Sequence, residues 1–145
     1  MLKICVLERT LNYKENIYED EYYEIFHHEK FSNVPGMVVI KPKLENWYSI
    51  DAAIEKLAIL EKIIRDYLLE IGIELVGIYR EQNEEGKFEI TMIPYHVHQL
   101  NLLGISPDLY QPFIEKYLNS FDSSHINEVK LINKKLSLKL GNVGE

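Results

Sequence analysis

The sequence has few of the features that mark secreted or membrane-spanning proteins. It contains one cysteine, Cys5, in 145 residues, which rules out an intramolecular disulfide. No apolar run approaches the roughly 20 residues that a transmembrane helix needs, and no charged start leads into an apolar signal segment. We therefore expect a cytoplasmic protein with no membrane partner.

Basic residues are also scarce. The 16 Lys and Arg residues are outnumbered by 23 Asp and Glu residues, which gives a formal net charge of −7. A protein that binds extended nucleic acid normally shows a basic patch, and the clearest basic cluster here, residues 130–139, is short. We expect no extended nucleic acid as partner. A small nucleotide stays possible, because its phosphates need only a few local donors.

What the sequence does contain predicts a single α+β domain over residues 1–145. Apolar and β-branched runs predict strands at 2–7, 22–26, 37–40, 73–79 and 87–93. Glycine-containing turns at 32–36 and 82–86 predict two antiparallel pairs. The expected fold is a mainly antiparallel sheet of about five strands with one long helix and one or two further helices.

The helices are predicted from apolar residues at helical spacing. The long helix, 51–71, carries Leu57, Leu60, Ile64, Leu68 and Ile71. A second helix is expected from Ser106 to about Phe121, with Phe113, Tyr117 and Leu118 inward. In the tail, 122–145, we expect a short helix from Ile126, Val129 and Ile132, and a strand from Leu136, Leu138 and Leu140.

Two histidines lie one residue apart in the stretch Tyr95-His96-Val97-His98. In a strand, residues i and i+2 point to the same face, so two imidazoles would stand side by side. Such a pair can bind a metal, or can join a nucleophile to a group that orients it. Pro94 precedes the pair, and a bulge or break there would switch the face that the histidines share.

Three stretches, in this order along the chain, resemble the histidine-triad (HIT) superfamily of nucleotide hydrolases and transferases. Residues 17–26 look like its opening acidic and aromatic strand. Residues 35–43, Pro-Gly-Met-Val-Val-Ile-Lys-Pro-Lys, are similar to its Pro-Gly-His-x-Leu-Val-Ile-Pro-Lys. Residues 95–98 are similar to the start of its His-x-His-x-His motif. The resemblance covers about residues 2–121, implies a HIT-like fold and leaves 122–145 as a C-terminal extension.

The sequence departs from the HIT pattern at several positions. Met37 stands where the family has a histidine, and Lys41 is an extra residue before Pro42. The family's acidic ribose-binding residue falls near His28, which cannot copy a carboxylate's acceptor role. The triad is incomplete, because Leu100 would occupy its last position.

Three alignments of the triad stay open. In the one we prefer, His96 and His98 are its first and middle residues. In the second, Pro94, His96 and His98 are the first, middle and last. In the third, Lys87, Glu89 and Thr91 replace all three histidines, and the protein is catalytically inactive.

The resemblance implies a covalent mechanism on a nucleoside phosphoramidate or a dinucleoside polyphosphate. His98 would attack the α-phosphorus to form a nucleotidyl-histidine, with His96 as its partner. The resemblance implies no metal or other cofactor, and it implies a homodimer with the long helix as a possible contact surface. The substrate-binding candidates are Asn83, Gln99, Asn101 and His28. The alternative is a catalytically inactive HIT-like module that binds a nucleotide or a protein.

The remaining chemistry-bearing residues receive simpler interpretations. A metal site on His96 and His98 would need a further ligand, such as Glu89 or His125, and no recognised spacing supplies it. His27, His28 and His125 are predicted to be surface residues, with His28 also kept as a substrate-binding candidate. Lys41, Lys43 and Arg80 are interpreted as solvated strand ends rather than phosphate ligands, and Trp47 and Tyr48 as core or interface aromatics.

Overall fold

The computed structural model describes residues 16–82, 85–95 and 117–142. Its strands are β1 (Asn16–Glu19), β2 (Tyr23–His27), β3 (Val38–Pro42), β4 (Leu75–Gln82) and β5 (Phe88–Tyr95). They form one antiparallel sheet in the order β1-β2-β3-β5-β4. The helical elements are η1 (Trp47–Ser49), α2 (Asp51–Glu70), η4 (Ser123–His125) and α5 (Ile126–Gly141). The described residues therefore form the α+β fold that the sequence predicts.

Both predicted hairpins are present. β2 pairs with β3 in the register Ile25↔Ile40, and Gly36 lies in the turn between them with φ +81°. β4 pairs with β5 along their whole length, and Gly86 follows β4 with φ +78°. A positive φ is costly for any residue with a Cβ atom, so the two glycines allow the chain to reverse at these points.

A further hairpin, between β1 and β2, is not evident from the strand patterns. It turns at Asp20, whose Oδ1 accepts hydrogen bonds from the backbone N–H groups of Tyr22 (2.8 Å) and Tyr23 (2.7 Å). An aspartate that accepts from the residues just after it is a turn-forming feature. Tyrosines stand on both sides of Asp20, and because aromatic residues favour strands, the sequence does not indicate a turn here.

β5 neither breaks nor bulges at Pro94. Its register with β4 continues through Val76↔Pro94 to Leu75↔Tyr95. β3 pairs with β5 only from Ile90 to Met92, so the ladder with β3 has ended before Pro94. A proline is tolerated where one side of its strand makes no ladder.

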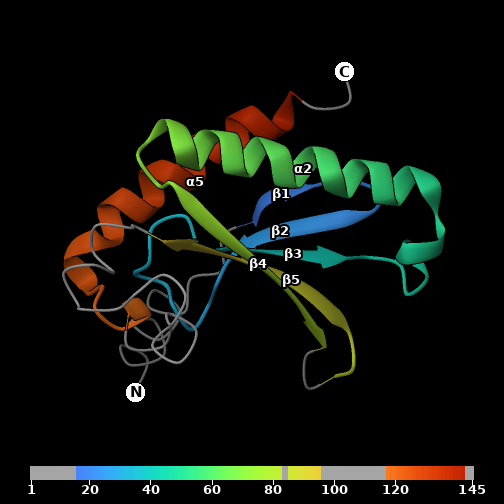
Figure 1. Ribbon diagram of the computed structural model, residues 1–145, viewed down its shortest axis with the longest axis horizontal. Coiled ribbons are helices and arrows are strands. Elements are labelled where there is room, and N and C mark those ends of the chain that lie inside the picture. The colour runs from blue at the N-terminus through green and yellow to red at the C-terminus, as the bar shows by residue number, and fades with distance from the viewer. Residues whose placement is uncertain (1–15, 83–84, 96–116, 143–145) are drawn as a thin grey trace, which may run out of the picture.

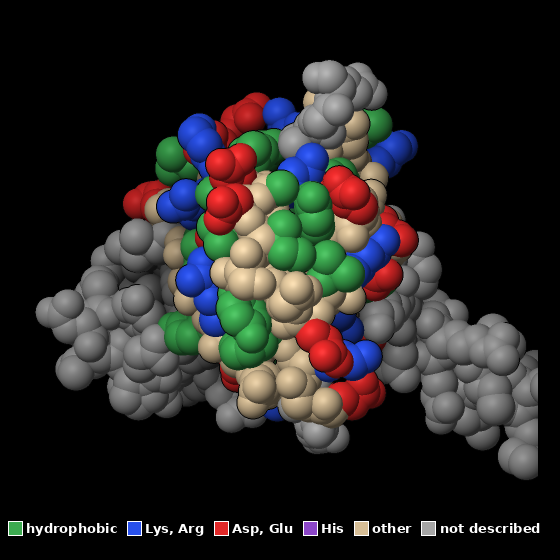
Figure 2. All heavy atoms as spheres, turned by 90° about the vertical axis from the view of Figure 1, so that its right-hand side faces the viewer, with side chains coloured by type: hydrophobic (Ala, Val, Ile, Leu, Met, Phe, Trp, Pro, Cys, Tyr) green, Lys and Arg blue, Asp and Glu red, His purple; other side chains and the backbone are tan. Residues whose placement is uncertain are grey.

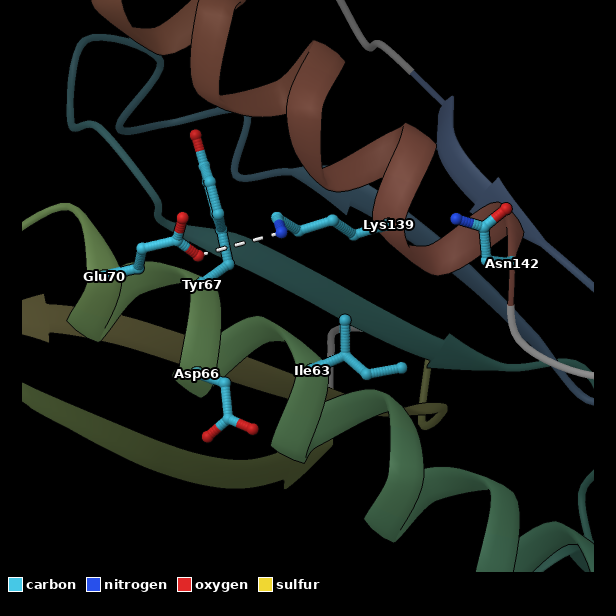
Figure 3. Close-up of a pocket in the computed structure, with 6 residues that line it drawn as sticks. All are labelled: Ile63, Asp66, Tyr67, Glu70, Lys139 and Asn142. Carbon is cyan, nitrogen blue, oxygen red and sulfur yellow. Dashed lines mark ion pairs between the residues drawn. The ribbon is translucent and has the colours of Figure 1, made fainter.

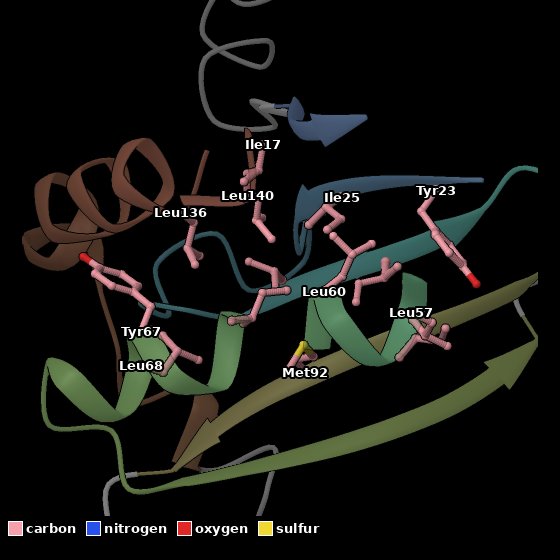
Figure 4. Close-up of a cluster of buried hydrophobic side chains, with 14 of the residues drawn as sticks. Ile17, Tyr23, Ile25, Leu57, Leu60, Tyr67, Leu68, Met92, Leu136 and Leu140 are labelled. Atoms are coloured by element: carbon pink, nitrogen blue, oxygen red, sulfur yellow. The ribbon is translucent and has the colours of Figure 1, made fainter. Parts of the chain in front are cut away.

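The main core lies between the sheet and the two helices. Figure 1 shows α2 running along the sheet with α5 beside it. The predicted stripe of α2 is buried at Leu57, Leu60, Ile64 and Leu68, whereas Ile71, just after the helix, is 39% exposed. These residues pack against strand residues and α5, and Figure 4 shows among others Ile25, Met92, Leu136 and Leu140 in the same cluster.

A second, smaller core lies on the opposite face of the sheet. Met92 belongs to the main core and its neighbour Ile93 to the second cluster, as expected for successive residues of a strand. The members of the second cluster are Val34, Met37, Ile93, Tyr117, Leu118 and Phe121. The prediction that Tyr117 and Leu118 point inward is confirmed. The predicted strand 2–7 and Phe113 lie outside the described residues.

The tail does not contain the predicted strand. α5 continues as one helix from Ile126 to Gly141. Leu136 and Leu140 are fully buried, whereas Leu138 is 66% exposed. Residues four apart share a helix face, so Leu136 and Leu140 continue the stripe of Val129 and Ile132. The apparent alternation arose because an exposed leucine lies between two buried ones. None of the described helices is long and apolar enough to cross a bilayer.

Candidate functional site

Of the six residues that the sequence assigns to catalysis or substrate binding, His28 belongs to the described ranges. The other five lie outside the described residues and stay predictions: His96, His98, Asn83, Gln99 and Asn101. Near the candidate site, the described structure therefore contains His28 and the strand that leads to His96.

Three strand ends meet at one edge of the sheet. His27, the last residue of β2, pairs with Val38, the first residue of β3. Val38 also pairs with Met92 of β5. β5 continues beyond this pair to Tyr95, and His96 is the next residue in the sequence. The chain thus leaves β5 toward His96 at the same edge where His28 follows β2.

His28 is half-buried and anchored at this edge. Its backbone N–H donates to the carbonyl of Met37 at 2.9 Å. Its Nδ1 accepts from the N–H of Phe31 at 3.4 Å, and the two rings lie 5.2 Å apart. With Nδ1 as acceptor, the neutral ring carries its proton on Nε2. His28 therefore offers a donor to an oxygen of a ligand.

Burial keeps the His28 ring neutral. It lowers the pKa of His28, and this effect outweighs the nearby carboxylate of Glu89, which acts to raise it. A neutral Nε2–H can donate to a phosphate or ribose oxygen without carrying charge. It cannot replace a carboxylate that accepts from ribose hydroxyls, as the sequence comparison with the HIT pattern already implied.

Met37, which stands where the HIT pattern has a histidine, is a packing residue. It is 1% exposed and lies in the second core with Ile93 and Tyr117. Its thioether has no hydrogen to donate, so this position contributes to the core beneath the edge.

The three cations considered as phosphate ligands each contact a carboxylate. Lys41 lies 3.7 Å from Glu89, Lys43 2.6 Å from Glu19, and Arg80 3.4 Å from Glu61. Their charges are thus matched within the chain, which favours their structural interpretation.

Trp47 is a core residue, as predicted. It is 8% exposed, and in the described part of the chain its buried Nε1 has no hydrogen-bond partner. Tyr48 and Phe88 pack edge-on against its ring at 6.1 and 6.3 Å and are 62% and 39% exposed. Figure 2 views the end of the molecule where α2 begins and shows apolar side chains gathered among charged ones.

The prediction that His27 lies on the surface is wrong, because its side chain is only 4% exposed. Its Nε2 lies 3.2 Å from the carbonyl of Phe31, and its Nδ1 lies 3.3 Å from Nδ2 of Asn133 in α5. His27 follows Tyr23 and Ile25 at the strand period of two, which was the available indication that it points inward. His125 is partly exposed and contacts Asp122 at 3.4 Å.

A groove of about 270 Å³ lies between α2 and α5 (Figure 3). Its lining residues are Ile63, Asp66, Tyr67, Glu70, Lys139 and Asn142. The ammonium of Lys139 lies 3.7 Å from Glu70 and 5.5 Å from the centre of the Tyr67 ring. Asp66 is paired with Lys62 at 2.6 Å. The groove's charged groups are therefore matched by the chain's own side chains, and it is a poor site for a nucleotide.

No group of three His, Cys, Asp or Glu side chains that could hold a metal ion occurs within residues 16–82, 85–95 and 117–142. Of the two further ligands considered for a metal site, Glu89 lies 3.7 Å from Lys41, and His125 lies against Asp122.

These elements define an α+β protein with a five-stranded antiparallel sheet, and known proteins offer a distant structural likeness to it. No family model matches the sequence. No curated protein matches it either. Among solved structures, the fold is similar to that of a histidine triad protein from Marinobacter aquaeolei VT8. The TM-score is 0.42 and the identity 12%, over 75% of this chain and 94% of that chain. Identity this low carries no information about activity.

Proposed function

We propose that the protein is a HIT-like nucleotide hydrolase or nucleotidyl transferase with its site at the sheet edge where β2 and β5 end. The observation that carries the proposal is the unbroken register of β5 through Pro94 to Tyr95, directly before His96 and His98. A regular strand up to this point supports a firm base for the two imidazoles. His28, with its Nε2–H donor, follows β2 at the same edge.

The proposed chemistry uses a neutral imidazole of His98. Its lone pair attacks the α-phosphorus, an N–P bond forms, and the bond to the leaving group breaks as that group takes up a proton. Water then attacks the nucleotidyl-histidine, the N–P bond breaks, and a nucleoside monophosphate and a proton leave. His96 orients the nucleophile. Donors to the phosphate oxygens would come from Gln99, Asn101 and His28. Asn83 follows Gln82, which pairs with Phe88 at the opposite end of β5 from Tyr95, so the proposed site does not use it.

His96 and His98 must also point to the same face of the sheet as His28 if all three contact one nucleotide. On unbroken alternation, His96 and His98 follow Met92 onto the face of the main core, whereas His28 lies within electrostatic reach of Glu89 on the other face. A one-residue bulge just after Tyr95 would bring the histidines to the face of His28. The contribution of His28 to nucleotide binding therefore tests whether the two histidines share its face.

The first experiment is an intact-mass spectrum of the protein mixed with adenosine phosphoramidate or diadenosine tetraphosphate and quenched in denaturant. Wild type, His96→Ala and His98→Ala are compared, and His125→Ala serves as a control for the loss of a histidine outside the His96–His98 pair. We expect a nucleotidyl adduct that is absent only in His98→Ala. Loss only in His96→Ala would move the nucleophile to His96. Absence of adduct and hydrolysis in all samples, with nucleotide still bound, would replace the enzyme by an inactive binding module.

Two further measurements complete the proposal. His28→Ala should weaken nucleotide binding and leave the adduct intact, and unchanged binding would remove His28 from the site. We also propose that the protein acts as a homodimer on a small nucleotide, and sedimentation analysis tests this, because a monomer at working concentration would contradict it.

A further inference from the structure

The outward face of α5 carries an exposed apolar ridge. Leu131 and Leu138 are 54% and 66% exposed. They are seven residues apart, about two helical turns, and so lie above one another on the same face. The residues of α5 that pack on the domain occupy the opposite face and are Val129, Ile132, Asn133, Leu136 and Leu140. The two leucines are therefore the outermost side chains of a helix whose core-facing side is already packed.

Lysines line both sides of this ridge. At about 100° per residue, Lys130 and Lys134 flank the leucines on one side and Lys135 flanks them on the other. All three residues are exposed, and within the described ranges no ion pair holds them. Lys130 and Lys134 are four residues apart on the helix, where like charges repel each other. The helix thus keeps an unfavourable concentration of positive charge around an apolar ridge.

This face is an exception on an acidic protein. The chain has a net charge of −7. α5 has four lysines and one carboxylate, Glu128, and one of these lysines, Lys139, is paired with Glu70. Glu128 is exposed on the same side of the ridge as Lys135, so the excess of positive charge is greatest on the side of Lys130 and Lys134. An apolar centre with cations on both sides is complementary to a surface that offers negative charge outside and hydrocarbon just below.

We propose that the outward face of α5 docks on anionic lipid bilayers, with Leu131 and Leu138 in the interface and Lys130, Lys134 and Lys135 on the headgroups. A nucleic-acid backbone would satisfy the lysines and leave the leucines without a partner. A second copy docked through the same helix would bring lysines against lysines. The bilayer satisfies both kinds of side chain, and the helix lies on the membrane without crossing it. This proposal departs from the expectation of no membrane partner, which rested on spanning and signal segments and not on a helix that lies on the surface.

Binding through this face is weak and depends on salt. Each lysine near an anionic surface strengthens partitioning by about fivefold. The acidic remainder of the protein is repelled, so the molecule must approach with α5 foremost. Because the charges are exposed, raising the ionic strength from low to well above physiological should abolish the interaction.

The test is cosedimentation of the full chain with vesicles of phosphatidylcholine, alone and mixed with phosphatidylserine. The variants are Lys130→Gln/Lys134→Gln and Leu131→Ser/Leu138→Ser. The control, Lys62→Gln/Lys87→Gln, removes the same charge from α2 and from the residue just before β5. All are first checked for native circular dichroism, which exposed substitutions should preserve.

We expect binding to the mixed vesicles only, weakened at least about tenfold by the two-lysine variant and clearly by the two-leucine variant, with the control unchanged. Equal binding to both vesicle types, or equal loss in the control, would overturn the proposal. So would an absence of binding to either vesicle. Binding of a labelled single-stranded RNA that is lost in the lysine variant alone, without vesicle binding, would replace the bilayer by nucleic acid.

Discussion

The imidazole of His27 and the amide of Asn133 meet in the interior, 106 residues apart in the sequence. Nδ1 of His27 lies 3.3 Å from Nδ2 and 3.4 Å from Oδ1 of Asn133. Nε2 faces the carbonyl of Phe31, which only accepts, so the ring proton belongs on Nε2. Nδ1 is then the acceptor, and Nδ2 of Asn133 is its donor. This contact ties β2 to α5 through polar atoms in an otherwise apolar layer.

Replacing Asn133 with alanine should destabilise the protein by about 1–3 kcal/mol, because Nδ1 of His27 would stay buried without a donor. The measurement is urea unfolding followed by circular dichroism. Asn127→Ala, at an exposed position of the same helix, is the control and should change stability by less than about 0.5 kcal/mol. Equal effects of the two substitutions would show that the His27 contact contributes nothing.

The same ring predicts a loss of stability in mild acid. Burial lowers the pKa of His27 below its ordinary value of 6.5, although hydrogen bonds to Phe31 and Asn133 act to raise it. Below pH 6.5, the His27 ring therefore binds a proton in the unfolded chain but stays neutral in the folded chain. Stability contributed by the neutral ring is complete above that pH and falls as the pH drops toward the folded pKa, by up to about 1.4 kcal/mol per pH unit.

Unfolding free energies measured between neutral pH and pH 5 test this prediction. Asn133→Asp is the informative variant, because a carboxylate beside Nδ1 favours the charged ring and should raise the pKa of His27, which reduces the slope. His28→Gln shows how much of the slope belongs to His28, whose pKa burial also lowers. A wild-type protein that gains stability on acidification over this range would contradict the assignment.

Gly36 combines a positive φ with a tight site. A Cβ atom there would lie 2.7 Å from Cδ2 of Leu68, which is fully buried in the main core. Gly86 has nearly the same φ, +78°, with nothing within 4 Å of the added atom. Both alanine substitutions meet backbone strain of about 1–2 kcal/mol, and Gly36→Ala adds an overpacking cost of about 1–3 kcal/mol. In thermal unfolding, Gly36→Ala should therefore lower the Tm clearly more than Gly86→Ala. Equal losses of stability in the two variants would mean that the Leu68 side chain moves aside at no cost.

The parts of the fold that follow a local period could be predicted from the sequence. The hairpins around Gly36 and Gly86 and the stripe of α2 are such parts. His27 and Asn133 could not be paired in this way, because no local pattern records a contact across 106 residues. β1 was missed because one side chain, Asp20, makes its turn.

For the candidate site, the sequence proposes which residues carry the chemistry but not which face of the sheet they share. His96 and His98 were proposed as catalytic residues from their spacing and from the HIT resemblance, and they stay predictions because they lie outside the described residues. The face that they share depends on whether the alternation of β5 continues, and Pro94 left both outcomes open. The register Val76↔Pro94 answers this for the strand up to Tyr95.

The helical tail gives the last prediction. In a helix, Leu136 and Leu138 point in different directions and differ sharply in burial. In a strand, residues two apart share a face, so both would be buried alike. Leu136 is fully buried and Leu138 is 66% exposed. Leu136→Ala should cost about 2–5 kcal/mol through lost burial and a cavity, and Leu138→Ala less than about 0.5 kcal/mol. Chemical denaturation measures both. Similar large losses for the two substitutions would favour the predicted strand over the helix. Similar small losses would mean that α5 does not pack on the core.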